Sequence, residues 1–69
     1  MNTYRELRTD MELFTAALLH VLVVVVDQDP FGPDEVIEPG GVVEAYTPQR
    51  VMVDGSWYSR KHCSFRIIE

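Results

Sequence analysis

The sequence predicts an α+β fold, in which one N-terminal helix packs on a small, mostly antiparallel sheet of four to five short strands. Three observations support this class: a capped helical pattern, a valine-rich run after it, and short apolar segments separated by turn signals in the second half. With 69 residues the chain has the size of one small domain, so we predict a single domain over 1–69. A small SH3-like barrel is one arrangement that such strands can adopt.

The first predicted element is a helix over about residues 10–20. Thr9 and Glu12 have the S/T-x-x-E spacing of a capping box, in which each side chain satisfies a backbone N–H of the first turn. Apolar residues then follow at spacings of three and four and are expected to form the stripe that packs on the sheet: Met11, Phe14, Leu18, Val21 and Leu22.

The valine-rich run predicts a strand over residues 21–26. Its β-branched side chains crowd the preceding turn of a helix but fit a pleated sheet. Because the run has no polar alternation, both of its faces should be covered, in a central strand under the helix or at a subunit interface. One helix continuing to Val26 is the alternative interpretation.

Residues 27–41 predict a long acidic loop. They hold five acids and no base, together with three of the four prolines and three of the four glycines. A short extended stretch is expected only at residues 36–37.

The acids of this loop fall at some of the ligand positions of a calcium-binding EF-hand loop. With Asp27 at position one, oxygen ligands and the turn glycine would fall on Asp29, Gly32, Glu35 and Glu38. Pro30, Phe31 and Pro33 interrupt the arc of ligands, so we predict no specific calcium site.

The remainder, 42–69, predicts a β-meander. Turn signals divide it into strands over 42–47, 50–54, 56–59 and 64–68. Asp54 and Gly55 are typical of a type I′ hairpin turn, which requires positive φ at both residues. In the strand that follows, Trp57 is expected to point into the core and Tyr58 towards solvent.

Candidate metal ligands and nucleophiles are few. His20, His62 and Cys63 supply three soft ligands where a closed zinc site needs four. His62 and Cys63 are adjacent, so on a strand they would point to opposite faces and could not act as a base and its nucleophile. No phosphate-binding or nucleophile-elbow motif occurs. We therefore predict no enzyme, no metal and no cofactor.

Charge and hydropathy predict a cytoplasmic protein without a membrane segment. The apolar block 13–26 is shorter than the ~20 residues that a spanning helix needs. The first ten residues mix acids and bases, unlike a signal peptide, and the single cysteine cannot form an internal disulfide. The net charge of -5 argues against indiscriminate binding to nucleic acid.

The two halves of the chain differ in charge and in aromatic content. Residues 1–48 carry nine acids and two bases, whereas residues 49–69 carry two acids and four bases, with aromatics interleaved. Arginine beside tyrosine and tryptophan is typical of protein-binding surfaces. The predicted protein-binding residues are Tyr46, Arg50, Tyr58, Arg60 and Arg66.

The predicted function is non-catalytic binding of a protein partner of unknown identity, by a small regulatory or accessory protein acting through this β-surface and the acidic loop. One alternative is a nucleic-acid-related module, either a binder through Arg50, Arg60, Arg66 and Trp57 or an acidic competitor of a DNA-binding protein. Another is a structural subunit that associates with itself. A homo-oligomer is expected, because so small a domain has little interior for its apolar residues.

Overall fold

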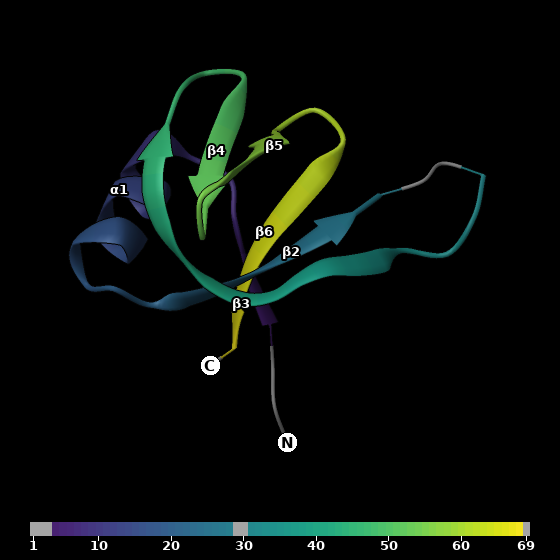
Figure 1. The fold of residues 1–69 in the computed structure, drawn as a ribbon, viewed down its shortest axis with the longest axis horizontal. Helices are drawn as coiled ribbons and strands as arrows, with labels where there is room; N and C mark the ends of the chain where they lie inside the picture. The colour runs from purple at the N-terminus through teal and green to yellow at the C-terminus, as the bar shows by residue number, and fades with distance from the viewer. Residues whose placement is uncertain (1–3, 29–30, 69) are drawn as a thin grey trace.

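The computed structural model describes residues 4–28 and 31–68 as one short helix and six strands (Figure 1). The strands form a single open antiparallel sheet in the order β1-β6-β2-β3-β4-β5. The α+β class is therefore confirmed, with six strands in place of four to five. In chain order the elements are β1 (Tyr4–Leu7), α1 (Asp10–Leu18), β2 (Leu22–Asp27), β3 (Glu35–Tyr46), β4 (Arg50–Val53), β5 (Ser56–Ser59) and β6 (Cys63–Ile68).

The long strand β3 gives the sheet its shape. It curves so that its first part pairs with β2 and its last part with β4 (Figure 1). Buried valines of β2 and β4, such as Val25 and Val53, share one core with residues of α1 and β6. The SH3-like barrel is not confirmed, because β1 and β5 are the two edges of an open sheet.

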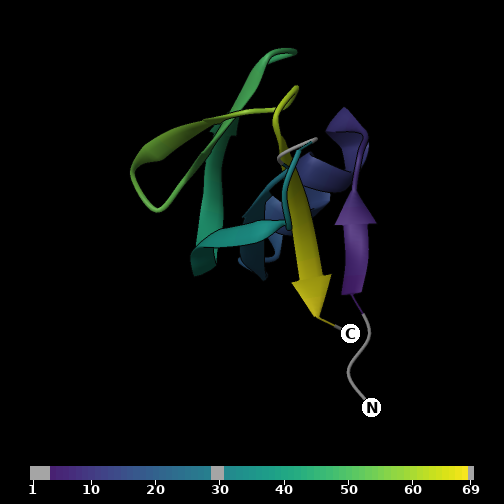
Figure 2. The same ribbon diagram turned by 90° about the vertical axis from the view of Figure 1, so that its right-hand side faces the viewer.

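The first strand, β1, was not predicted. It pairs with β6 from Tyr4 opposite Ile68 to Leu7 opposite Phe65, and the two strands run side by side in Figure 2. The predicted meander was wrong at the same place, since β6 pairs with β2 and β1 rather than with β5. Both differences arise from pairing between segments that are distant in the sequence, which local sequence signals do not report.

Helix α1 begins at the predicted capping box. The Thr9 hydroxyl accepts from the Glu12 N–H at 3.2 Å, and the Glu12 carboxylate accepts from the Thr9 N–H at 3.1 Å. The helix ends at Leu18, two residues before the predicted end, and His20 follows with a φ of 55°. Strand β2 then begins at Leu22, so the strand interpretation of the valine run is confirmed and the continuous helix is wrong.

The hydrogen bonds at this cap predict a pH dependence of stability. Donation by the Arg8 N–H, and then by the Thr9 N–H and hydroxyl, lowers the pKa of Glu12 below its ordinary value. A carboxyl with a lowered pKa stabilises the fold above its unfolded pKa, and this contribution disappears as the pH falls through the folded pKa. We expect Glu12→Gln to lower the melting temperature at neutral pH, and the difference from the wild type to shrink as the pH is lowered from neutral through the folded pKa of Glu12. A difference that stays constant over this range of pH would contradict the assignment.

The helix packs through a different face from the one predicted. Leu13 and Ala16 are buried, and Ala17 is packed against the core. The residues of the predicted stripe are exposed, apart from half-buried Val21: Met11, Phe14, Leu18 and Leu22. Positions 13, 16 and 17 also follow a spacing of three and four, and their two alanines allow close approach to the sheet. The spacing alone did not distinguish the two faces.

The acidic loop is shorter than predicted, because β3 already begins at Glu35. Glu35 lies opposite Asp27, so this part of the segment is the arm of a hairpin (Figure 1). Pro39 fits within β3 because the register with β2 shifts around it. Pro39 has no register partner on β2, so the N–H that proline lacks is not needed for the sheet. Asp29 and Pro30 lie outside the described residues.

The turn between β4 and β5 has the predicted conformation. Asp54 has a φ of 50° and Gly55 a φ of 82°, as a type I′ turn requires. The Glu44 carboxylate accepts a hydrogen bond from the Gly55 N–H and so connects the turn to β3. This turn sets the register of β5, and with it the orientation of Trp57 and Tyr58.

Candidate functional site

The five predicted binding residues do not share one surface. Tyr46 and Tyr58 are half-buried and pack against the core. Arg60 lies after the end of β5 and Arg66 lies on β6, whereas Arg50 lies on β4. The structure therefore separates residues that the sequence analysis grouped by composition.

Arg60 connects distant parts of the backbone. Its Nη1 donates to Asp10 Oδ1 and to the Thr47 carbonyl, both at 2.7 Å, and its Nη2 donates to the Arg8 carbonyl at 3.4 Å. The side chain is largely buried, with 18% of its surface exposed. These contacts hold the start of α1 against the segment between β3 and β4, which is a structural role.

Arg66 lies on the face of the sheet that α1 does not cover. Its Nη2 is 3.7 Å from Asp34 Oδ2, and its register partner on β2 is Val24. Arg8 is also paired, with its Nε 2.6 Å from Glu6 Oε2. Three arginines of the described residues are thus ion-paired, which reduces the positive charge available to a phosphate backbone.

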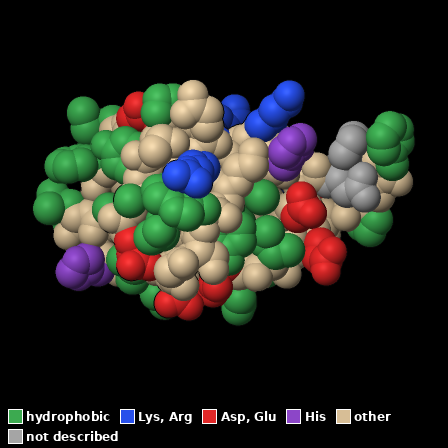
Figure 3. Space-filling view, turned by 45° about the horizontal axis from the view of Figure 1, so that its top comes forward, with side chains coloured by type: hydrophobic (Ala, Val, Ile, Leu, Met, Phe, Trp, Pro, Cys, Tyr) green, Lys and Arg blue, Asp and Glu red, His purple; other side chains and the backbone are tan. Residues whose placement is uncertain are grey.

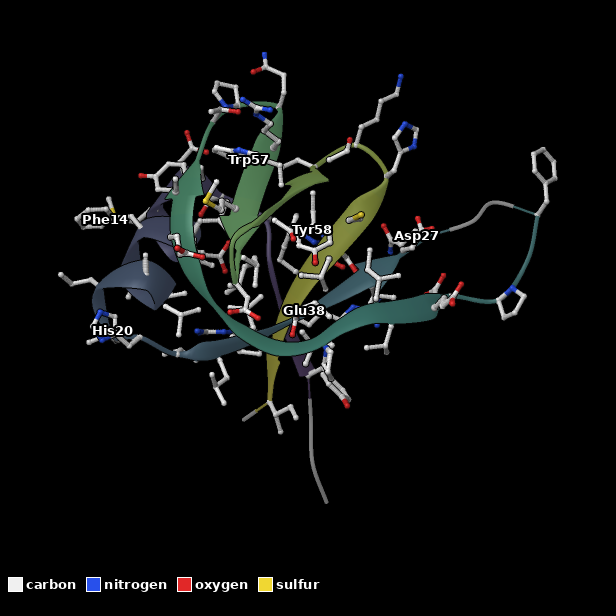
Figure 4. All side chains as sticks on the ribbon, viewed as in Figure 1. Phe14, His20, Asp27, Glu38, Trp57 and Tyr58 are labelled. Atoms are coloured by element: carbon white, nitrogen blue, oxygen red, sulfur yellow. The ribbon has the colours of Figure 1, made fainter. Side chains whose placement is uncertain are left out.

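Trp57 and Tyr58 are oriented opposite to the prediction. Trp57 is 39% exposed, whereas its neighbour Tyr58 packs against the core (Figure 4). Register explains the reversal, because the two-residue turn pairs Val51 with Tyr58 and Met52 with Trp57. Directly paired residues lie on the same face, and Val51 is fully buried. The turn and the inward valine therefore contained enough information to place Trp57 outside.

The outward residues of these two strands form the candidate binding surface, which we call the β4–β5 face: Arg50, Met52 and Trp57. The Arg50 guanidinium carbon lies 4.1 Å from the centroid of the Trp57 ring, within the range of a cation–π interaction. Met52 is half-buried and is the register partner of Trp57. On this face the planar Arg50 guanidinium lies against the Trp57 ring and restrains its orientation, and Met52 adds apolar surface beside the ring.

The side chains considered as metal ligands and nucleophile, His20, His62 and Cys63, do not form a group of metal ligands in the described part of the chain. Within residues 4–28 and 31–68, no three His, Cys, Asp or Glu side chains are grouped as metal ligands. Burial, and then the negative charge of Asp27, raise the pKa of the Cys63 thiol. A raised pKa favours the thiol over the reactive thiolate.

In the described part of the chain, buried Ser64 Oγ has no hydrogen-bond partner.

Comparisons of the chain with protein-family models, with curated proteins and with solved structures found no match. Among the described residues, no helix is long and apolar enough to cross a bilayer.

Proposed function

We propose that this protein is a non-catalytic binding module that contacts another protein through the β4–β5 face. The observation that supports this most directly is the chain's single tryptophan, which lies on the outer side of the sheet beneath an arginine. Burying a tryptophan in an interface contributes more to binding than burying most other side chains, and arginine is the other residue enriched at such positions.

The position of the face at a sheet edge suggests the form of the partner. β5 is the last strand of the sheet, so one side of its backbone has no strand partner among the described residues. An extended segment can pair with such an edge, while a neighbouring pocket or ring binds one of its side chains. An extended segment carrying an apolar residue beside a carboxylate would complement both Trp57 and Arg50.

Protein is favoured over nucleic acid as the partner. A base-stacking platform needs an open aromatic ring and a row of free cations, whereas one side of the Trp57 ring already has Arg50 against it. Arg60 and Arg66, which the nucleic-acid alternative also requires, are paired with Asp10 and Asp34. The net charge of -5 would further repel phosphates.

Paired affinity enrichment from the native host, using wild-type protein and Trp57→Ala as baits, tests the proposal. We expect at least one protein to bind the wild type and to lose about 2 kcal/mol of binding, or roughly thirtyfold in affinity, with Trp57→Ala. The same variant should stay folded, because an exposed side chain contributes little to the core.

Phe31→Ala is the matched control, since Phe31 is an exposed aromatic residue outside the β4–β5 face. It should retain the partner, and Arg50→Ala should weaken it. Equal loss with Phe31→Ala and Trp57→Ala would contradict the proposal, as would a partner insensitive to both. A bound fraction that is removed by nuclease would instead support the nucleic-acid alternative.

A further inference from the structure

Helix α1 presents an apolar surface to solvent, opposite the face that it buries. Met11 is 71% exposed, Phe14 51% and Leu18 67%, and we call these three residues the α1 stripe. Figure 4 shows Phe14 projecting from the helix away from the body of the molecule. Hydrophobic side chains gather at this end in the space-filling view (Figure 3). The exposure of the α1 stripe is an observation independent of the β4–β5 face.

The α1 stripe has the spacing of a helix-pairing seam. Positions 11, 14 and 18 are separated by three and four residues, as are the apolar positions of a coiled-coil heptad. Its centre is aromatic, and its two ends carry unbranched Met11 and γ-branched Leu18, which are of similar size. A surface with this symmetry is complementary to itself, which a two-fold interface requires.

We propose that the α1 stripe binds the α1 stripe of a second copy of this chain, with the two helices antiparallel about a two-fold axis at Phe14. In this arrangement the two Phe14 rings contact each other at the axis. Met11 of each copy lies against Leu18 of the other. Helix pairing of this kind places the two helix axes about 8–10 Å apart, a gap that side chains of this size can fill.

Charge selects the antiparallel orientation over the parallel one. The first turn of α1 carries Asp10 and Glu12, and its last turn carries no basic residue. Because Asp10 is ion-paired with Arg60, the repulsion in a parallel pair would come from the two Glu12 carboxylates. Antiparallel pairing places each acidic turn beside the uncharged last turn of the other helix, and it aligns the two helix dipoles favourably.

The apolar area is sufficient for a weak dimer. Beside the α1 stripe, exposed Leu19 and Met11 border an apolar groove of about 220 Å³ between α1 and β1. Together the stripe and Leu19 present on the order of 500 Å² of apolar surface, towards the upper end for a monomer. A stable complex buries about 800 Å² on each partner, so this interface is smaller than the standard size and we expect a weak dimer with a dissociation constant in the high micromolar range.

The net charge predicts how salt affects the dimer. Each copy carries a charge of -5, so association brings two negative bodies together. Salt screens this repulsion and leaves apolar burial intact. The dimer should become tighter between about 0.05 and 0.5 M NaCl, whereas a dimer held by ion pairs would weaken.

Sedimentation equilibrium on the full chain tests the pairing. The wild type should show a monomer–dimer equilibrium in the high micromolar range, and Phe14→Glu should weaken it at least tenfold. Phe31→Glu makes the same chemical change outside the α1 stripe and should leave the dimer intact. Trp57→Ala should also leave it intact, so failure of the dimer and failure of the proposed function are distinguishable.

Cross-linking provides a measurement that does not depend on how the glutamate variant folds. A cysteine can form a disulfide with the same cysteine of a second copy only if it lies close to the two-fold axis, because the two Cα atoms must be within about 7 Å of each other. In a Cys63→Ser background, Phe14→Cys should form a dimeric disulfide rapidly on mild oxidation with diamide, and Phe31→Cys should not.

Three results would overturn the proposal. The first is a wild-type chain that remains monomeric at several hundred micromolar, which would leave the α1 stripe to a different protein or to a lipid surface. The second is a dimer of unchanged strength in Phe14→Glu, which would place the interface elsewhere. The third is slow cross-linking of Phe14→Cys in a protein that does dimerise, which would exclude the antiparallel two-fold at this residue.

Discussion

Leu13→Ala is expected to lower the free energy of unfolding by about 3 kcal/mol, because it removes a side chain that the core encloses on all sides. Leu13 is 1% exposed and belongs to the same buried cluster as Val25 and Val53. For a chain of this size the whole stability is roughly 3–10 kcal/mol, so the variant should be partly unfolded at 37 °C. Urea denaturation followed by circular dichroism measures the change.

Leu18→Ala is the matched control, because it makes the same substitution in the same helix on the exposed face. It should change the free energy of unfolding by less than about 0.5 kcal/mol, measured at a concentration where the chain is monomeric. Equal losses for the two variants would mean that α1 packs through both faces. A larger loss for Leu18→Ala would restore the stripe that the sequence predicted.

Gly41→Ala is expected to destabilise the fold by about 1–3 kcal/mol through overpacking. A Cβ atom at Gly41 would lie 2.8 Å from Val53 Cγ1 and 3.0 Å from Asp54 Cβ, which is closer than side-chain carbons normally approach. Val53 is fully buried and cannot move aside without disturbing the core. The clash arises where β3 crosses close to the turn between β4 and β5.

Gly40→Ala separates this steric effect from the general effect of losing a glycine. The nearest atom to a Cβ at Gly40 is Leu22 Cβ at 4.0 Å, an ordinary contact, and neither glycine has a positive φ. Gly40→Ala should therefore be neutral or slightly stabilising, by reducing the entropy of the unfolded chain. Thermal unfolding of the two variants side by side provides the comparison, and similar destabilisation by both would refute the steric explanation.

The sequence predicted best where the physical cause is local. The Thr9 cap needs only residues within one turn, and the Asp54-Gly55 turn needs only two positive φ angles, so both were found. The valine run was correctly assigned to a strand because β-branched crowding also acts between neighbours. Each of these depends on interactions within four residues along the chain.

The candidate site could also have been placed more accurately from sequence. A two-residue turn at Asp54 fixes which residues of β4 and β5 are paired, and burial of Val51 then requires Tyr58 to face inward. The alternation of side chains within β5, taken alone, does not include this pairing with β4. Alternation from an outward Tyr58 predicts an inward Trp57, whereas the register of the hairpin places Trp57 outside.

Local signals determined the α+β class, the start of α1, the nature of β2 and the conformation of one turn. Only the tertiary structure decided the pairing of β1 with β6, the extent of β3, and which face of α1 is buried. The reason is that each of these depends on a partner distant in sequence: β1 carries no strand signal of its own, and β3 includes Pro39 at a register shift. The two faces of α1 have equivalent spacing, and contact of the Leu13 side with the core selected between them.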